Sequence, residues 1–196
     1  MSQICLVTGG ARSGKSSFAE LLASYTNSPV VYIATAQIFD EEMVERVKKH
    51  RQQRPSDWIV LEEPVHLADA LSSYAEFEGV ILVDCVTIWL SNLLLPHLDS
   101  LTNVLSIQEI EQKLLSEVKR CLKVAKQVKP QVIFVTNEVG QGIVPENYLA
   151  RVYRDLAGRC NQLIAKSADE VYLVVAGYPI EIKHPGQKIL DSLSKE

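Results

Sequence analysis

The sequence predicts an α/β fold in which helices flank a mostly parallel sheet, and three observations support this. Short runs of Val, Ile and Leu recur along the 196 residues, and most runs are continuous rather than alternating with polar residues. Continuous runs are typical of strands that are covered on both faces. Helix-like segments separate the runs, and strands that alternate with helices form parallel sheets. We expect one domain over residues 1–183 and a polar, mobile tail over residues 184–196.

Six apolar runs predict the strands of this sheet. They are Ile4 to Thr8, Val30 to Ala34, Trp58 to Leu61, Val80 to Asp84, Val132 to Thr136 and Val171 to Ala176. A further segment, Ile180 to Lys183, alternates apolar and polar residues after Gly177 and Pro179. This alternation predicts a half-exposed edge strand that turns back, antiparallel, on the last of the six.

Periodicity and capping residues predict five helices between the strands. They are Lys15 to Tyr25, Glu41 to Gln53, Val65 to Ala75, Ile107 to Val128 and Glu146 to Ser167. In the fourth of these, apolar residues recur at spacings of three, four or seven. Such spacing is typical of an amphipathic helix that covers a sheet.

The composition excludes several classes of protein. With 20 basic and 24 acidic residues, the formal net charge is -4, so the basic excess typical of nucleic-acid binding is missing. The cysteines Cys5, Cys85, Cys121 and Cys160 are far apart, which favours reduced thiols over a zinc site or a disulfide framework. The first residues lack the basic n-region and the apolar core of a signal peptide, and no apolar stretch approaches the ~20 residues that span a bilayer. We therefore expect a cytoplasmic protein without membrane insertion.

The strongest motif directly follows the first predicted strand. Residues 9–16, GGARSGKS, match G-x-x-x-x-G-K-[ST] in full. This motif predicts a P-loop, in which backbone N–H groups cradle phosphate oxygens, Lys15 binds the β and γ oxygens, and Ser16 binds Mg²⁺. The nucleotide-binding residues are then Gly9, Gly10, Ala11, Arg12, Ser13, Gly14, Lys15 and Ser16. The fold class is therefore that of a P-loop NTPase with a RecA-like sheet.

Polar residues at two other strand ends are candidates for the same site. Asp84 closes a buried strand, where P-loop proteins place an acidic residue that holds the metal directly or through water. The alternative is that Asp84 caps a helix that begins near Thr87. Thr136, Asn137 and Glu138 follow another strand, and ligands of parallel sheets bind at such ends. An ordinary turn is the competing interpretation there.

A P-loop alone does not distinguish kinases from switches or motor ATPases. Four longer stretches are more informative: VTGGARSGKSSFAE at 7–20, YIATAQIFDEEMVERVKKHRQQRPSDW at 32–58, VTNEVGQGIVPENYLARVYRDLAGRCNQ at 135–162, and ADEVYLVVAGYP at 168–179. With these stretches the sequence resembles the bifunctional adenosylcobinamide kinase and adenosylcobinamide-phosphate guanylyltransferase family of cobalamin biosynthesis. The resemblance covers about Ile4 to Lys183, and its second and third stretches are the specific ones.

The resemblance implies a covalent mechanism at His50. In the family, a histidine a few residues ahead of an Arg-Pro pair attacks the α-phosphate of GTP and carries GMP, and here Arg54 and Pro55 follow His50. A neutral imidazole is a competent nucleophile near pH 7. From spacing alone, the alternative is that His50 extends the apolar face of a surface helix, because Met43 and Val47 lie seven and three residues before it.

The resemblance also implies further ligands and partners. The co-substrates would be GTP, ATP or both, with Mg²⁺ held by Ser16 and Asp84 or Glu62, and the acceptor would be a corrinoid. The family forms homo-oligomers, which implies a trimer here. The positions that match nucleotide contacts of the family are Ala34, Thr35, Ala36, Arg51, Gln52, Gln53, Arg54, Glu62 and Asp84.

Two other functions are compatible with the P-loop. One is a monofunctional small-molecule kinase, which would form a nucleoside diphosphate and never pyrophosphate. The other is a non-enzymatic, nucleotide-switched assembly module on a RecA-like sheet, which would bind a partner without corrinoid turnover. The acidic charge balance counts against the second.

Overall fold

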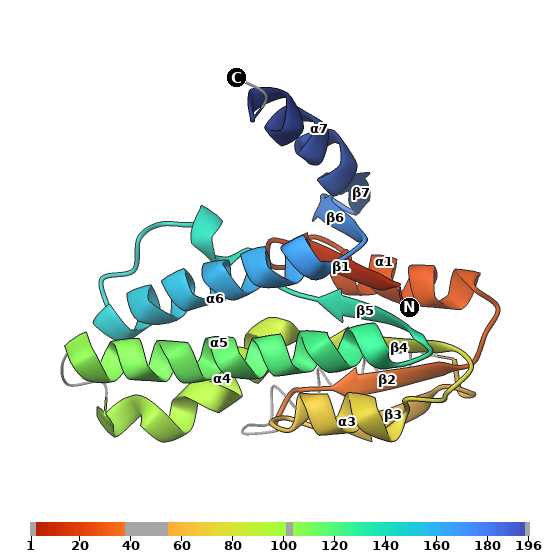
Figure 1. Ribbon diagram of the computed structural model, residues 1–196, viewed down its shortest axis with the longest axis horizontal. Coiled ribbons are helices and arrows are strands. Elements are labelled where there is room, and N and C mark those ends of the chain that lie inside the picture. The colour runs from red at the N-terminus through yellow and green to blue at the C-terminus, as the bar shows by residue number, and fades with distance from the viewer. Residues whose placement is uncertain (1–2, 38–54, 101–103, 195–196) are drawn as a thin grey trace.

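The described residues of the computed structural model, 3–37, 55–100 and 104–194, form a seven-stranded sheet with the order β3-β2-β4-β5-β1-β6-β7 (Figure 1). Six neighbouring strands are parallel, and β7 is antiparallel to β6. The strands are β1 (Ile4–Gly9), β2 (Val30–Ala34), β3 (Ile59–Glu62), β4 (Val80–Asp84), β5 (Gln131–Val135), β6 (Glu170–Val175) and β7 (Tyr178–Glu181). The predicted fold class, including the antiparallel edge strand, is confirmed.

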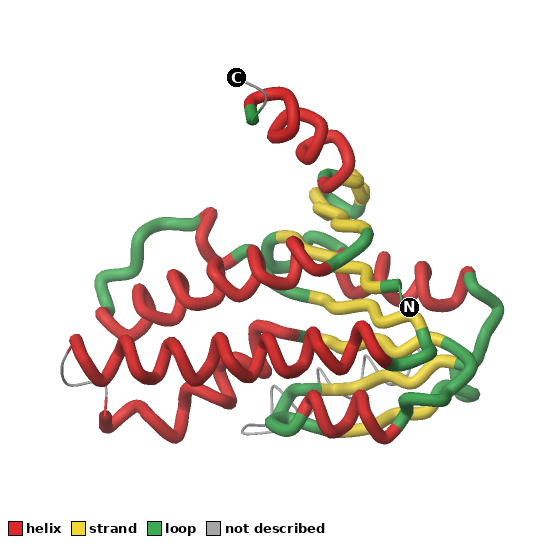
Figure 2. The backbone as a smooth tube through the Cα atoms, viewed as in Figure 1, coloured by secondary structure: helices red, strands yellow, loops and turns green. Residues whose placement is uncertain are grey.

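Helices cover both faces of the sheet (Figure 2). The larger group packs on one face and α1 packs on the other. The helices are α1 (Lys15–Tyr25), α3 (Leu67–Ser73), α4 (Val86–Leu94), α5 (Val104–Gln127), α6 (Tyr148–Ser167) and α7 (Lys183–Leu193), with 3-10 turns η1 (Leu95–Ser100) and η2 (Val139–Gln141). None of these helices is long and apolar enough to cross a bilayer.

Strand β5 shows why the apolar runs are continuous. Val132 and Phe134 pack into the core under α3 to α6, whereas Ile133 and Val135 pack into the core on the α1 side. Successive side chains of a strand point to opposite faces, so a strand with two covered faces needs apolar residues at every position. β5 is buried from Val132 to Val135, as its sequence predicts.

The structure differs from the prediction at the β3 edge of the sheet and in the C-terminal tail. β3 is an edge strand, and both Ile59 and Val60 are 43% exposed, because only β2 pairs with it. The predicted polar tail instead contains α7, whose Ile189 and Leu193 are exposed. A helix was not predicted for these residues. The predicted helix Glu41 to Gln53 lies outside the described residues.

The four cysteines are free, as expected. Cys5, Cys121 and Cys160 are buried, and Cys85 is half-buried. Burial raises the pKa of the Cys5 thiol to about 12, with a smaller contribution from the nearby carboxylates of Glu170, Asp169 and Glu181. Cys5 is therefore a neutral apolar side chain of the core at physiological pH.

Two glycines give a matched test of the packing. A Cβ on Gly79 would overlap the carbonyl oxygen of Pro29, which accepts a hydrogen bond from Val80 at the start of β4. We expect Gly79→Ala to lower the free energy of unfolding by about 1–3 kcal/mol, the usual cost of overpacking. Gly158 lies in α6, where a Cβ would meet open space. Gly158→Ala should instead stabilise the protein by roughly 0.5–1 kcal/mol, because alanine favours a helix. Urea unfolding of both variants would check the contrast, and equal effects would contradict it.

Candidate functional site

The P-loop connects β1 to α1 through a tight turn. The N–H of Ser13 donates to the carbonyl oxygen of Gly10 over 3.2 Å, and the N–H of Phe18 donates to that of Gly14 over 2.9 Å, which begins α1. Gly14 has φ 93°, a left-handed conformation that glycine adopts without steric cost. No acidic side chain occupies the first turn of α1. The free N–H groups of this helix start therefore suit a phosphate.

The turn between β6 and β7 supports the P-loop from one side. The N–H of Gly177 donates to the carbonyl oxygen of Ser13 over 2.8 Å. A Cβ on Gly14 would lie 3.1 Å from the Cα of Gly177, and a Cβ on Gly9 would lie 2.5 Å from the carbonyl oxygen of Val174. Both P-loop glycines are thus required by close backbone packing as well as by the turn.

Lys15 is held over the loop. Its Nζ donates to the carbonyl oxygen of Gly10 over 3.1 Å. Partial burial lowers the pKa of the ammonium below its ordinary value of 10.5, while the nearby Cys85 and Asp84 act in the opposite direction. The cation therefore lies near Asp84, partly withdrawn from solvent, where an anionic ligand would compensate its charge.

The parallel register aligns the carboxyl ends of the strands. Ala34 of β2 pairs with both Glu62 of β3 and Asp84 of β4. Val135 of β5 in turn pairs with Asp84 and with Val7 of β1, two residues before the P-loop. Glu62, Ala34 and Asp84 therefore lie in one row, at the edge from which the P-loop emerges. The structure brings these three predicted residues and the P-loop to the same end of the sheet, the one formed by the carboxyl ends of the strands.

Asp84 does not cap α4. The N-cap residue of α4 is Cys85, and the side chain there makes no capping hydrogen bond. Instead, the buried Tyr32 hydroxyl donates to Oδ2 of Asp84 over 3.0 Å, and Asp84 is half-buried. This contact orients the carboxylate, and the capping alternative for Asp84 is wrong.

Thr35 is fully buried, and its polar groups are engaged within the protein. Its Oγ1 donates to the Cys85 carbonyl oxygen and accepts from the Cys85 N–H, each over 2.8 Å. The Thr35 N–H donates to the carbonyl oxygen of Asp84 over 3.2 Å, and its own carbonyl accepts from Asn92 Nδ2 over 2.8 Å. Thr35 thus ties the end of β2 to the backbone beside Asp84. Ala34 and Ala36 flank it, both half-buried.

A second polar network lies at the end of β5. Thr136 Oγ1 donates to Asn161 Oδ1 over 2.7 Å, and Asn161 Nδ2 contacts Glu138 Oε1 over 3.2 Å. Thr8 Oγ1, next to the P-loop, donates to the same Glu138 oxygen over 2.7 Å. The strand end that the sequence left open is therefore joined to the P-loop strand and to α6. It is not an ordinary exposed turn.

Sequence reasoning missed Tyr32, Asn92 and Asn161. The signal that could have found the two asparagines is a carboxamide within an apolar helix face, because buried amides need specific partners. Asn92 is 57 residues from its partner Thr35 in the sequence, and Asn161 is 25 residues from its partner Thr136. A single sequence gives no means of naming such pairs. Five predicted site residues lie outside the described residues: His50, Arg51, Gln52, Gln53 and Arg54.

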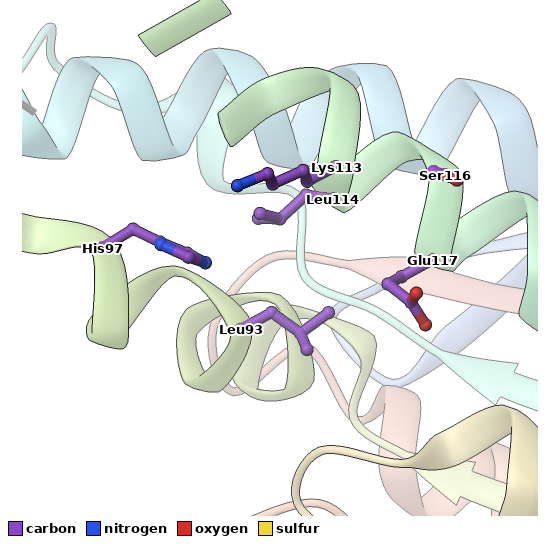
Figure 3. A pocket seen from close by; sticks show the side chains of 6 residues that line it. All are labelled: Leu93, His97, Lys113, Leu114, Ser116 and Glu117. Atoms are coloured by element: carbon purple, nitrogen blue, oxygen red, sulfur yellow. The ribbon is translucent and has the colours of Figure 1, made fainter. Parts of the chain in front are cut away.

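A hollow elsewhere on the surface contains none of the predicted site residues. It lies between the α4–η1 segment and α5, where His97 and Lys113 approach it from opposite sides (Figure 3). Its other lining residues are Leu93, Leu114, Ser116 and Glu117. The candidate site is therefore the carboxyl edge of the sheet, and this hollow is a separate feature of the helical layer.

Comparison with known proteins decides the family. The sequence model of the family described as cobinamide kinase / cobinamide phosphate guanyltransferase matches residues 5–182. The chain belongs to this family. A relative from Escherichia coli (strain K12), named bifunctional adenosylcobalamin biosynthesis protein CobU, is 45% identical, with 91% of this chain and 98% of that protein covered. The protein of the same name from Salmonella typhimurium is 42% identical, again over 91% and 98%.

A third family member and a solved structure extend the comparison. The bifunctional adenosylcobalamin biosynthesis protein CobP of Pseudomonas aeruginosa is 43% identical over 91% of this chain and 96% of its own. The structure of an ATPase from a type III secretion system has a TM-score of 0.55 and 12% identity, with 88% of this chain and 52% of that chain covered. That likeness supports the P-loop NTPase fold. The family match ends at residue 182, directly before α7.

The half-buried position of Lys15 generates a test of the site. Because its pKa in the folded state lies below the ordinary value, the charged form destabilises the fold at every pH below that folded value. We expect Lys15→Met to raise the free energy of unfolding of the ligand-free protein at pH 7. The gain should shrink as the pH rises from the lowered pKa of the folded state toward 10.5, above which the lysine is neutral in both the folded and the unfolded chain.

The same variant should bind a nucleoside triphosphate at least about 30-fold more weakly, because charge-assisted bonds to phosphate are lost. Isothermal titration and denaturant unfolding would measure the two effects. Lys119→Met, on the exposed surface of α5, is the matched control and should change neither quantity. A Lys15→Met protein that is less stable than the wild type, or that binds nucleotide normally, would contradict this account of the site.

Proposed function

We propose that this chain carries out the two reactions for which its family is described, with adenosylcobinamide as the acceptor. First, the terminal hydroxyl of the aminopropanol arm takes the γ-phosphoryl group of a nucleoside triphosphate. GMP then passes from GTP, through a covalent enzyme intermediate, to the new phosphate, which gives adenosylcobinamide-GDP and pyrophosphate. The observation that carries the proposal is a complete P-loop beside the Glu62, Ala34 and Asp84 row, in a chain that matches the family over residues 5–182.

The P-loop supplies the electrostatic part of both reactions. Phosphoryl transfer requires that charge on the transferring oxygens be stabilised and that the reacting groups be aligned. The N–H groups around Gly14 and the ammonium of Lys15 would hold the phosphates. In the structure the ammonium donates to the Gly10 carbonyl oxygen. A phosphate would take over this donor and would compensate its partly buried charge.

Mg²⁺ is the metal that we propose for the site. Ser16 lies in the first turn of α1 next to Lys15, and the Asp84 carboxylate is kept in one orientation by Tyr32. Mg²⁺ prefers oxygen ligands and is usually bound by one or two carboxylates together with substrate phosphates and water, so these residues fit it. Ser16 and Asp84 would hold the ion, with Glu62 assisting, and the ion would neutralise charge on the phosphates. Thr35 and Asn92 would keep the backbone at Asp84 in place.

The guanylyl carrier in this proposal is His50. Its imidazole would attack the α-phosphorus of GTP, and pyrophosphate would leave with the electrons of the broken bond. The neighbouring guanidinium of Arg54 would stabilise the phosphate oxygens. Contacts to the guanylyl group are proposed for Arg51, Gln52 and Gln53, and contacts to the nucleotide for Ala34 and Ala36. For Thr35 we propose support through the backbone, because its hydroxyl bonds Cys85.

The remaining expectations concern assembly and location. We propose that the protein is a homo-oligomer, with the trimer as the expected form, and that the triphosphate donor of the first reaction is ATP or GTP. A cytoplasmic location agrees with four free cysteines, which persist in reducing compartments. The corrinoid would approach the carboxyl edge of the sheet.

Trapping the covalent GMP intermediate tests the proposal that His50 carries the guanylyl group. Incubation with Mg²⁺ and GTP labelled at the α-phosphate should leave label on the protein that acid removes and base does not, as for a phosphoramidate. His50→Ala should abolish this label and the transfer of GMP, yet retain phosphorylation of adenosylcobinamide within about threefold, because the first reaction needs no carrier. Intact-protein mass and product chromatography would measure both. A His50→Ala protein that still carries the label would contradict the assignment.

Lys15→Met is the complementary variant. It should lower both reactions by at least about 100-fold, because both need a cradled triphosphate. The two alternative functions give different results in the wild type. A monofunctional kinase would produce a nucleoside diphosphate without pyrophosphate or covalent label. An assembly module would bind a partner in a nucleotide-dependent manner and would turn over no corrinoid.

A further inference from the structure

Asn137, the residue after Thr136, lies on the P-loop side of the sheet. The N–H of Thr136 donates to the Val7 carbonyl oxygen over 2.9 Å, and the N–H of Glu138 donates to that of Gly9 over 3.0 Å. These bonds continue the parallel ladder between β5 and β1 beyond Val135, so side chains keep alternating between faces. Thr136 and Glu138 both bond Asn161 of α6 and so lie on the α6 side. Asn137, between them, therefore lies on the opposite side, with α1 and the P-loop.

The sheet order places Asn137 between the two halves of the candidate site. β5 lies between β1, which leads into the P-loop, and β4, which ends at Asp84. Val135 is level with both Val7 and Asp84. Asn137 stands two residues beyond this level, at the carboxyl edge. Asn137 therefore lies between the P-loop and Asp84, the two parts of the candidate site that would hold the terminal phosphate of a nucleotide.

The Asn137 carboxamide has an unused acceptor. Its Oδ1 is enclosed, and no donor among the described residues bonds it. The described residues contain one other such buried side-chain atom, Oγ of Ser13 in the P-loop. A buried polar atom without a partner is costly, and native proteins retain few of them. Both unpaired atoms belong to the same edge of the sheet, which points to a ligand that brings hydrogen-bonding groups there.

The chemistry of an acceptor limits which ligand can pair with it. Phosphate oxygens of a bound nucleotide offer no donor at neutral pH, whereas an alcohol offers one O–H donor. Of the two reactions proposed above, only the first has an alcohol as the attacking group. In the second, the attacking group is a phosphate monoester. An unpaired acceptor at this place therefore fits the attacking alcohol of the kinase reaction better than the attacking phosphate monoester of the guanylyl transfer.

We propose that Asn137 is a catalytic residue of the first reaction, in which its Oδ1 accepts a hydrogen bond from the alcohol of the corrinoid arm. The bond would align the alcohol oxygen with the γ-phosphorus. That oxygen forms the new bond to phosphorus, the bond from phosphorus to the bridging oxygen breaks, and its electron pair leaves with the nucleoside diphosphate. The alcohol proton passes to water. The carboxamide itself exchanges no proton, because its role is orientation.

The network behind Asn137 fixes its position. Asn161 Nδ2 donates to the Asn137 carbonyl oxygen over 3.2 Å, and the same group contacts Glu138. Glu138 is in turn bonded by Thr8, directly before the P-loop. Asn161, Glu138 and Thr8 are therefore positioning residues. They link the backbone of Asn137 to α6 and to the start of the P-loop, so that the carboxamide and the phosphate cradle keep one relative geometry.

This inference rests on the proposed function, and its test separates the two. Wild-type, Asn137→Leu and Asn137→Asp proteins would be compared in three assays: phosphorylation of adenosylcobinamide, covalent labelling by GTP, and transfer of GMP to adenosylcobinamide phosphate. Removing the acceptor in Asn137→Leu should lower kcat of phosphorylation by about tenfold, the effect of losing one neutral hydrogen bond to the substrate. Labelling and GMP transfer should stay within about threefold, because neither uses an alcohol. Asn137→Asp retains an acceptor and should restore most of the lost rate.

Each other outcome would overturn the proposal. Loss of all three activities in Asn137→Leu, with unchanged thermal stability, would assign Asn137 to the nucleotide site as a whole. Loss of phosphorylation in both variants would mean that the NH₂ donors matter and the acceptor does not. Normal phosphorylation in both would exclude Asn137 from the reaction. Asn137→Ala replaces the leucine variant if that protein unfolds. A wild-type protein without any of the three activities would instead contradict the proposed function.

Discussion

The parallel register of the sheet is the constraint on which the site depends. Because β2, β3 and β4 pair level with one another, Glu62, Ala34 and Asp84 occupy one row. The same row continues through Val135 to Val7, two residues before the P-loop. A shift of one residue in any of these pairings would turn polar strand ends toward an apolar face. The continuous apolar runs of β4 and β5, with both faces buried, keep these two strands in the interior through the energy of burial.

Around this row, three sets of hydrogen bonds keep polar groups in place where the strands end. Tyr32 orients the Asp84 carboxylate, and Thr35 and Asn92 hold the backbone next to it. Glu138 joins the P-loop strand to α6 through Thr8 and Asn161. Each set links elements that are distant in sequence. A rigid arrangement of this kind suits phosphoryl and nucleotidyl transfer, where catalysis depends on positioning and preorganised charge.

Much of the fold could be predicted from the sequence, because burial on both faces leaves a direct pattern. The bounds of α1, β2 and β4 were predicted without error, and the P-loop was predicted from its motif alone. The edge strand β3 was harder to predict. Ile59 and Val60 resemble a buried strand in composition, although β3 has a neighbour on one side only. The role of Thr35 could not be predicted either, since its hydroxyl bonds a backbone 50 residues away. Nor could the pairing of Thr8 with Glu138, 130 residues apart.

The contact between the β6–β7 turn and the P-loop sets a lower limit on the working length of this fold. Gly177 donates to Ser13, and Gly14 leaves no room for a side chain against Gly177. A truncated protein that ended after the last parallel strand would keep the nucleotide motif and most of the core, yet it would lose the backbone that braces the loop. Minimal fragments for crystallography or design should therefore retain the hairpin through Glu181, whereas α7 is the segment to shorten first.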